Sequence, residues 1–386
     1  MSGLKRILTL TDLTLFGVAS IMGSGGFNLI GNAVRAGGSQ WPMTCGFASL
    51  LLLGTSYTYS RMFEHSEKGN TMESDVVRSV FGKVAEYTTI AGILVFNIVS
   101  ISVILVFCSH ILVPSGPWIQ QVTIALSFLA GMTYVALEGI EYNRTLIDGW
   151  TIGMVIVLTA VASLGMYGSV SSKLPDITLP SFQNWKRSLL LFFFVLAGFD
   201  ALTKFVEETK DTDTVPRSFF TSNLVSVVLT FGIALAIALW VPLTKGNEDN
   251  AFGHVLEHFL GNGVAEGFLP ILVACMLVTT FVVFLSITRN IYGVGKTLDI
   301  PYFLRLNDAK APYVAIGLVA AFVAFGILNN HTETLVMVSD FGLIATILLV
   351  SAAVSVSDWK KGNHVPASFS CMTTIGVGSL LALYLV

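Results

Sequence analysis

Residues 20–27 read Ser-Ile-Met-Gly-Ser-Gly-Gly-Phe and lie inside the first long apolar stretch of the chain, residues 10–33. Three of the four residues from Gly23 to Gly26 are glycine, and each would weaken a helix by about 1 kcal/mol. A helix in lipid can be interrupted only where its freed backbone groups bind something else. The stretch therefore predicts a helix that breaks inside a membrane, with free amide groups that suit a carboxylate.

A second break is expected in the sixth apolar stretch, residues 188–207, which contains Ala197-Gly198-Phe199-Asp200. Glycine interruptions at corresponding places in two halves of a transporter are the best sequence indication of its binding site. Carbonyl groups freed at this break would suit an ammonium group. Small residues also let membrane helices pack closely, so Gly198 alone would fit packing as well as binding.

The composition places nearly all of the chain in a bilayer. Hydrophobic residues make up 54% and charged residues 12% of 386, against about 45–50% and 25% in soluble domains. Eleven spans of roughly 20 residues would need about 220 residues. We therefore expect an all-α membrane protein with a single transporter domain, residues 1–386. Its spans are residues 10–33, 39–60, 84–113, 119–137, 146–170, 188–207, 218–243, 266–288, 311–328, 332–357 and 365–386.

The polar connectors indicate a doubled unit. Residues 61–83 and 289–310 are similar in length and follow the second and the eighth span. Repeat one would cover about 10–170 and repeat two about 188–357, with an extra helix at about 365–386. An odd number of helices per unit makes the second copy enter from the other side of the membrane, which is the 5+5 inverted repeat of many secondary transporters.

The basic residues give the expected orientation. With the N-terminus in the cytoplasm, 16 Lys and Arg fall inside and five outside, which accounts for all 21. The positive-inside rule thus favours a cytoplasmic N-terminus, and a plasma membrane is the expected location. Residues 244–265 then form an external connector with helical character, and the C-terminus lies outside.

Charged residues inside the spans are costly in hydrocarbon and are candidate functional groups. Asp200 and Asp340 could each bind a substrate amine, carry a coupling proton or only hydrogen-bond a neighbouring helix. Glu207 and Glu208 lie at the inner end of the sixth span, where we expect them to pair as a gate with connector arginines such as Arg78 or Arg289. These four carboxylates are the predicted coupling or gating residues.

Three further polar residues are expected to have structural roles. Asp12 stands in a capping position at the start of the first helix. His110 and Asn97 of the third span are interpreted as satisfied interior polar groups.

Several classes of function receive no support from the residues. The longest Lys/Arg run has two residues and the net charge is −3, so no nucleic-acid surface is expected. The four cysteines lie in apolar runs without CxxC spacing, which predicts neither a metal site nor a disulfide. No catalytic constellation indicates an enzyme or a cofactor. An amino acid receptor that does not transport would be expected to have a longer cytoplasmic tail than residues 1–9. An ion channel would need a continuous polar lining, whereas the charged residues in these spans are isolated.

Three segments resemble those of the amino acid/polyamine permeases of the APC superfamily, which have the LeuT-type fold. They match, in order, the family's first helix, its sixth helix with the exit, and its eighth helix with the following loop. The segments are residues 20–27 with Gly37-Gly38, Gly198-Phe199-Asp200 with Glu207-Glu208-Thr209-Lys210, and Arg289-Asn290-Ile291-Tyr292 through Asp299-Ile300-Pro301. Their order and spacing agree with the family from residue 10 to about residue 357.

The resemblance implies alternating-access uptake or exchange of amino acids or related amines, independent of sodium or coupled to protons. It implies that the backbone of residues 24–26 holds a substrate carboxylate, that carbonyls near Phe194 and Ala197 hold the amine, and that Phe194 and Phe199 are aromatic gates. The predicted substrate-binding residues are Ser20, Gly23, Ser24, Gly25, Gly26, Phe27, Phe194, Ala197, Gly198, Phe199 and Asp200.

Departures from the family bear on specificity and coupling. Ser20 and Phe194 stand where arginine/agmatine antiporters have Asn and Trp, so arginine specificity is not implied. Gly153 or Met154 falls where many prokaryotic members have a Lys in place of a sodium ion, which leaves the coupling ion open. Members commonly have twelve helices, and eleven are expected here.

The expected partners are a small amine-bearing substrate and the lipid bilayer. A polyamine is the alternative substrate, because Asp200 and Asp340 could hold two amines. Heteromeric members bond a glycoprotein through a Cys in the loop after the third helix. Residues 114–118 contain no Cys, so such a partner is not expected, and the chain is predicted to be a monomer or a homodimer.

Overall fold

The computed structural model describes residues 3–22, 24–66, 69–171, 180–241, 251–261, 264–329 and 332–385. Over these residues the chain is helical, and the one isolated β-bridge joins Leu8 to Thr209. The helices are α1 (Leu10–Met22), α2 (Ser24–Gly37), η1 (Gly38–Gln40), α3 (Trp41–Met62), α4 (Met72–Phe81), α5 (Lys83–Leu112), α6 (Trp118–Leu137), α7 (Ile140–Ser171), α8 (Phe182–Val195), η2 (Phe199–Glu208), η3 (Thr212–Thr214), α9 (Val215–Trp240), α10 (Ala251–Leu260), α11 (Val264–Thr297), η5 (Pro301–Leu304), α12 (Tyr313–Leu328), α13 (Thr332–Lys360) and α14 (His364–Leu385).

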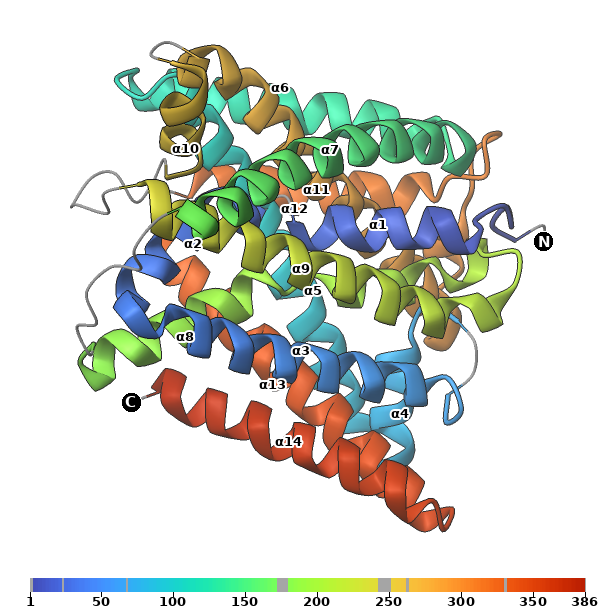
Figure 1. The fold of residues 1–386 in the computed structure, drawn as a ribbon. Coiled ribbons are helices and arrows are strands. Elements are labelled where there is room, and N and C mark those ends of the chain that lie inside the picture. Colours follow the sequence, from blue (N-terminus) through green and yellow to red (C-terminus); the bar gives the residue numbers. More distant parts are fainter. Residues whose placement is uncertain are drawn as a thin grey trace.

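The long helices run alongside one another, and the two chain ends lie at opposite ends of the molecule (Figure 1). Within the described residues, eight helical segments are long and apolar enough to cross a bilayer. Leu10–Met22 and Tyr313–Leu328 are also apolar but shorter. The predicted all-α membrane class agrees with this architecture, whereas the number of spans and the inverted repeat stay predictions.

Some helices continue into the predicted polar connectors. α11 extends to Thr297, beyond the expected end at residue 288, and α7 begins at Ile140 instead of residue 146. Both extensions contain an arginine whose charge is paired, Arg289 with Glu208 in α11 and Arg144 with a carboxylate of α1 in α7. The pairing offsets the cost of burying a charge in these helices. The hydropathy of the sequence therefore underestimates the length of both helices.

Asp12 caps α1, although it lies at the third helical position and not at the N-cap. The Thr9 amide donates to Asp12 Oδ2 at 2.6 Å, and the Asp12 amide faces Thr9 Oγ1 at 3.5 Å, which is the reciprocal arrangement of a capping box. Arg144 Nε adds an ion pair with Asp12 Oδ1 at 2.9 Å. The start of α1 is thereby fixed to α7.

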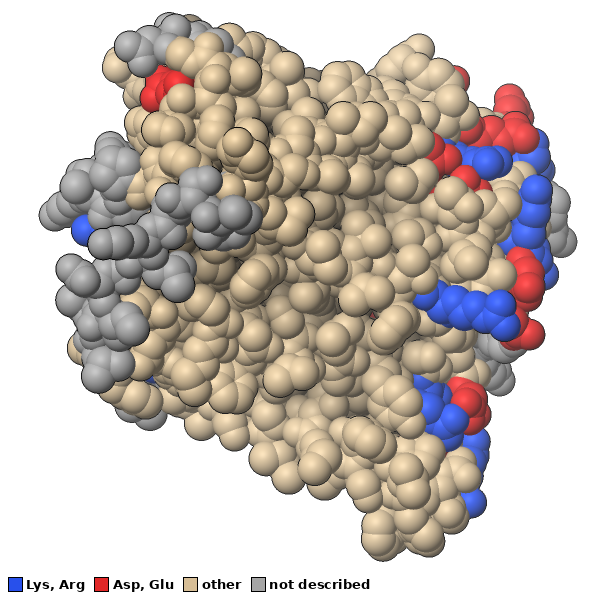
Figure 2. All heavy atoms as spheres, viewed as in Figure 1, with Lys and Arg blue, Asp and Glu red and all other residues tan. Residues whose placement is uncertain are grey.

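Charged side chains gather at one end of the molecule, the end at which the N-terminus lies (Figure 2). The middle of the visible face is covered by uncharged residues. This distribution is the one expected for a protein whose middle contacts hydrocarbon.

Candidate substrate site

The sixth predicted span is interrupted between α8 and η2. Gly198 has a φ of +118°, a conformation that residues with a side chain rarely adopt, and it turns the chain from one helix into the next. No described N–H donates to the carbonyl groups of Leu196 and Ala197. The break therefore presents the free hydrogen-bond acceptors that the sequence predicts.

The end of α1 lies directly against this break. α1 ends at Met22 and α2 begins at Ser24, and the predicted first break at Gly23 lies outside the described residues. A Cβ on Gly198 would lie 2.5 Å from the carbonyl oxygen of Ser20, so α1 touches the break after α8 through backbone. α2 packs against α8, and α1 packs against η2. These segments thus meet at one central crossing.

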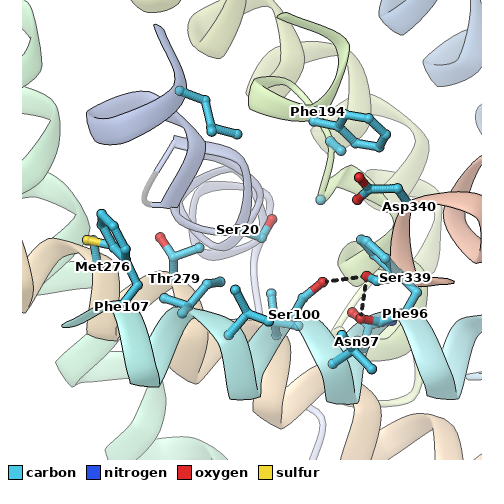
Figure 3. A pocket seen from close by; sticks show the side chains of 17 residues that line it. Ser20, Phe96, Asn97, Ser100, Phe107, Phe194, Met276, Thr279, Ser339 and Asp340 are labelled. Carbon is cyan, nitrogen blue, oxygen red and sulfur yellow. Dashed lines mark hydrogen bonds between the residues drawn. The ribbon is translucent and has the colours of Figure 1, made fainter. Parts of the chain in front are cut away.

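A cavity of about 270 Å³ opens beside this crossing. Ser20 of α1 and Ala197 and Gly198 of the second break contribute to its wall (Figure 3). The other walls come from α5, α11 and α13. The remaining lining residues are Leu29, Phe96, Asn97, Val99, Ser100, Val103, Ile104, Phe107, Phe194, Met276, Thr279, Val283, Ser339 and Asp340.

Five of the predicted site residues meet at this cavity. Ser20, Phe194, Ala197 and Gly198 line it, and Asp340 points into it beside the Phe194 ring (Figure 3). The residues come from α1, α8 with the following break, and α13, which are far apart in the sequence. The sequence prediction of a site at the two breaks therefore agrees with the position of the cavity.

Hydrogen bonds hold the polar wall of the cavity in place. Thr279 Oγ1 donates to the Ala19 carbonyl at 2.5 Å, which joins α11 to α1. Ser339 Oγ donates to the Phe96 carbonyl at 3.3 Å and lies 3.3 Å from Ser100 Oγ, which joins α13 to α5 (Figure 3). The site is thus built on packed helices and not on loops.

Most of the α5 residues that line the cavity were not predicted from the sequence. Residues at helical spacing on one face of α5 line the cavity, and they include Phe96, Ser100, Val103 and Phe107. The available signal was this three-to-four-residue spacing around Asn97. Asn97 was interpreted as a satisfied interior group; its amide does donate to the Ile93 carbonyl at 2.9 Å, and it also lines the cavity.

Two predicted residues of the second break do not line this cavity. Phe199 is fully buried and packs edge-on against Tyr59 with ring centroids 5.1 Å apart. Asp200 is buried and interacts electrostatically with Lys204 and Glu73. Both residues face the interior on the η2 side of the break.

A buried charge cluster surrounds Asp200. Lys204 forms an ion pair with Glu73, and both side chains are 1% exposed. Thr203 Oγ1 donates to Glu73 Oε1 at 2.5 Å, and Glu73 Oε2 has no hydrogen-bond partner among the described residues. The cluster contains two carboxylates and one ammonium group, so one negative charge is left without a compensating cation.

Two more ion pairs connect η2 to α11. Arg289 Nε and Nη2 each donate to a Glu208 carboxylate oxygen at 3.1 Å, and both side chains are almost fully buried. The sequence predicted this pairing, whereas its other predicted arginine, Arg78, pairs with Glu86. Glu207 pairs with Lys296 nearer the surface. The end of η2 is therefore fixed by one buried pair and one partly exposed pair.

The N-terminal segment closes over the same end of η2. The Ile7 and Leu8 amides donate to the Glu208 carbonyl at 2.8 and 3.0 Å, and the Lys210 amide donates to the Leu8 carbonyl at 2.9 Å. These bonds and the ion pairs lie toward the end of the molecule that carries the N-terminus (Figure 1). The end of η2 is thus held against both the N-terminal segment and α11.

The side chains at the predicted first break are not described. Gly23 lies outside the described residues. Ser24, Gly25, Gly26 and Phe27 form the first turn of α2, for which only the backbone is described. Their predicted contacts with a substrate remain predictions.

Comparisons with known proteins identify the family of the chain. A profile of the family described as "Amino acid permease" matches residues 8–386. A branched-chain amino acid permease of Bacillus subtilis (strain 168) is 23% identical, covering 95% of this chain and 84% of that protein. A low-affinity putrescine importer of Escherichia coli (strain K12) is 19% identical, covering 93% and 82%. A methylthioribose transporter of Bacillus subtilis (strain 168) is 22% identical, covering 95% and 84%.

Proposed function

The chain belongs to the amino acid permease family, and from this premise we propose that it is a secondary transporter that moves amino acids or related amines by alternating access. One observation carries the proposal: Ser20, near the end of α1, and Ala197 and Gly198, at the break after α8, line the same cavity. Interrupted helices whose freed backbone groups face a central cavity are the usual binding sites of secondary transporters.

The proposed topology has eleven spans. α1 with α2 and α8 with η2 each form one interrupted span, and α3 and α12 are counted together with the long apolar helices. The first ten spans form the 5+5 inverted repeat, and α14 is the extra helix. The charged end of the molecule faces the cytoplasm, because basic residues are retained on that side. A plasma membrane and a monomer or homodimer complete the proposal.

The proposed transport cycle rests on the ion pairs that hold the end of η2 at Glu207 and Glu208. Substrate enters from the outside and reaches the cavity, while the ion pairs of Glu208 with Arg289 and of Glu207 with Lys296 close the cytoplasmic side. Release to the cytoplasm requires that η2 separates from α11. Phe194, which lines the cavity, is the proposed aromatic gate on the entry side.

Coupling is assigned to the buried cluster of Asp200, Lys204 and Glu73. Its two carboxylates share one ammonium group, so a proton bound there would balance the remaining negative charge. Asp200 and Lys204 lie on η2 directly after the break, where a change in charge acts on the segment that closes the cytoplasmic side. We assign Asp200 to proton coupling and not to the substrate amine.

A polyamine substrate is less well supported than a substrate with one amine. That alternative needs two carboxylates at the substrate, and of Asp200 and Asp340 only Asp340 lines the described cavity. The similarity to a putrescine importer keeps diamines among the substrates to be tested.

Uptake into proteoliposomes tests the proposal. Purified full-length protein is reconstituted, and flux of labelled amino acids, monoamines and diamines is measured with and without sodium and a pH gradient. Accumulation of at least one of these compounds is expected, driven by the pH gradient or by exchange. Empty liposomes and the Gly198→Val variant are the controls. Absence of flux for every compound under every gradient would refute the transporter assignment.

A further inference from the structure

The cavity contains one charged group among its described lining residues, the carboxylate of Asp340. The other polar side chains are the neutral Ser20, Asn97, Ser100, Thr279 and Ser339. Residues 23–28 of the first break, whose side chains are not described, include no ionisable residue in the sequence. The electrostatic character of the cavity is therefore set by a single negative charge.

This carboxylate has no cationic partner among the described residues. No hydrogen bond and no ion pair to Asp340 is found there, in contrast to Asp12, Asp358 and Glu208, each of which pairs with an arginine. The neutral phenol of Tyr384 interacts with it electrostatically. An ionised carboxylate inside a membrane protein is costly unless a cation compensates it. A bound proton or the cation of a ligand that enters the cavity can supply this compensation.

The backbone that carries Asp340 is firmly held. Ser339 bonds to the α5 backbone at Phe96, and a Cβ on Gly342 would lie 3.4 Å from the Gly92 carbonyl oxygen. α13 therefore rests directly on α5 on both sides of Asp340. A side chain fixed in this way is suited to orient a ligand group and not merely to attract it.

The surroundings of Asp340 suit an ammonium group attached to an apolar body. The carbonyl group of Ala197, which lines the cavity at the nearby break, is a further acceptor without a donor among the described residues. The rest of the wall is mainly aromatic and aliphatic, with Phe96, Phe107 and Phe194 among its members. A primary ammonium group needs three acceptors, and a carboxylate with neighbouring carbonyls can supply them.

We infer that Asp340 selects a compact organic monocation, with one primary ammonium group and an apolar body, over a zwitterionic amino acid and over a diamine. This inference rests on the proposed transport function and narrows its substrate class. A monocation and Asp340 together carry no net charge. A zwitterion adds its own carboxylate and leaves one negative charge, which the start of a helix offsets only by about half an elementary charge.

A diamine fails for the opposite reason. Its second ammonium group would lie against the aromatic and aliphatic wall, where the described residues provide no second carboxylate. The cavity volume of about 270 Å³ also limits the ligand, since it corresponds to roughly nine water molecules of liquid volume. The favoured ligands are small branched or aromatic amines.

Three matched ligands test the inference on wild-type protein. Isoamylamine is leucine without its carboxyl group, and putrescine is a linear diamine of similar size. Binding to the detergent-solubilised full-length protein is measured by isothermal titration calorimetry. Isoamylamine is expected to bind at least about tenfold more tightly than either leucine or putrescine. Equal or tighter binding of leucine or putrescine would overturn the inference, while the proposed transport function would stand.

Variants then connect the selectivity to Asp340. Asp340→Asn is expected to weaken isoamylamine binding at least about tenfold, and Asp340→Glu to retain part of the affinity. Asp299→Asn, an exposed substitution with the same change of charge, should bind as the wild type does. Unchanged isoamylamine affinity in a folded Asp340→Asn protein would also overturn the inference. Failure of every ligand to bind and to be transported would instead refute the proposed function itself.

Discussion

Gly198 lies directly against the carbonyl oxygen of Ser20, at a distance that leaves no room for a side chain. The contact joins the end of α1 to the break between α8 and η2, so at this point α1 and the interrupted span meet backbone to backbone. A displacement of either helix is transmitted to the other at the wall of the cavity. The first prediction tests this contact.

Gly198→Ala should impair both folding and transport. The added Cβ would meet the Ser20 carbonyl at 2.5 Å, and the φ of +118° is unfavourable for alanine, which together should cost about 1–3 kcal/mol or more. Thermal unfolding and proteoliposome uptake measure the two effects. Gly131→Ala in α6 is the matched control, since nothing lies within 4 Å of its added Cβ. Wild-type uptake by Gly198→Ala would contradict the close contact.

The buried pair of Glu208 and Arg289 should show strong energetic coupling. Arg289→Met alone leaves a buried carboxylate uncompensated and should destabilise the protein by about 3–5 kcal/mol. The double variant Glu208→Leu with Arg289→Met should recover much of this loss, because neither charge remains. A double-mutant cycle based on chemical or thermal unfolding measures the coupling. Additive effects of the two substitutions would contradict a direct buried pair.

The partly exposed pair of Glu207 and Lys296 provides the comparison. Lys296 is 44% exposed, so solvent screens this pair, and Lys296→Met should change stability by no more than about 1 kcal/mol. The same unfolding measurement applies. A loss as large as that of Arg289→Met would show that burial does not distinguish the two pairs.

Lys204→Met should make the thermal stability of the protein depend on pH. Without Lys204, Glu73 and Asp200 remain buried with no cation, so the variant should be much less stable than wild type at neutral pH. Protonation of the carboxylates at lower pH removes the uncompensated charge, and the stability deficit should shrink as the pH falls toward the usual carboxylate range of about 4. Melting temperatures of both proteins across this range measure the effect. A deficit that grows on acidification would contradict the predicted cluster.

Asp200→Asn should flatten the dependence of uptake on pH. The substitution keeps the size of the side chain and removes its ability to gain or lose a proton, which the proposed coupling requires. Initial uptake rates are compared with those of Asp299→Asn, which lies on the surface and should keep the wild-type profile. An unchanged profile in Asp200→Asn would remove this residue from the coupling mechanism.

The break at Gly198 could be predicted from the sequence because a glycine in an apolar stretch has a strong local effect. Gly198 and its neighbour Ala197 indicated where carbonyl groups would be free, and these residues line the cavity. Asp340 could be identified because a carboxylate within an apolar stretch is conspicuous. The pairing of Glu208 with Arg289 followed from two opposite charges near the inner ends of two predicted helices.

The remaining features depend on contacts between distant segments. Glu73 lies in α4, a helix inside a connector that reads as polar, and nothing near it in the sequence indicates a pair with Lys204. Phe199 belongs to the break motif, yet its ring packs on Tyr59 of α3. Local patterns determine where a helix breaks, whereas the packing of other helices determines which way each side chain at the break faces.

The winding of η2 would allow its end at Glu208 to move along the helix axis. Ten residues in a 3-10 helix are unusual, because this geometry rarely extends beyond a few residues. At a rise of about 2.0 Å per residue the segment is roughly 20 Å long, and the same residues wound as an α-helix would span roughly 15 Å. A change of winding alone could therefore retract Glu208 by roughly 5 Å and rotate it about the helix axis while both neighbouring helices stay in place.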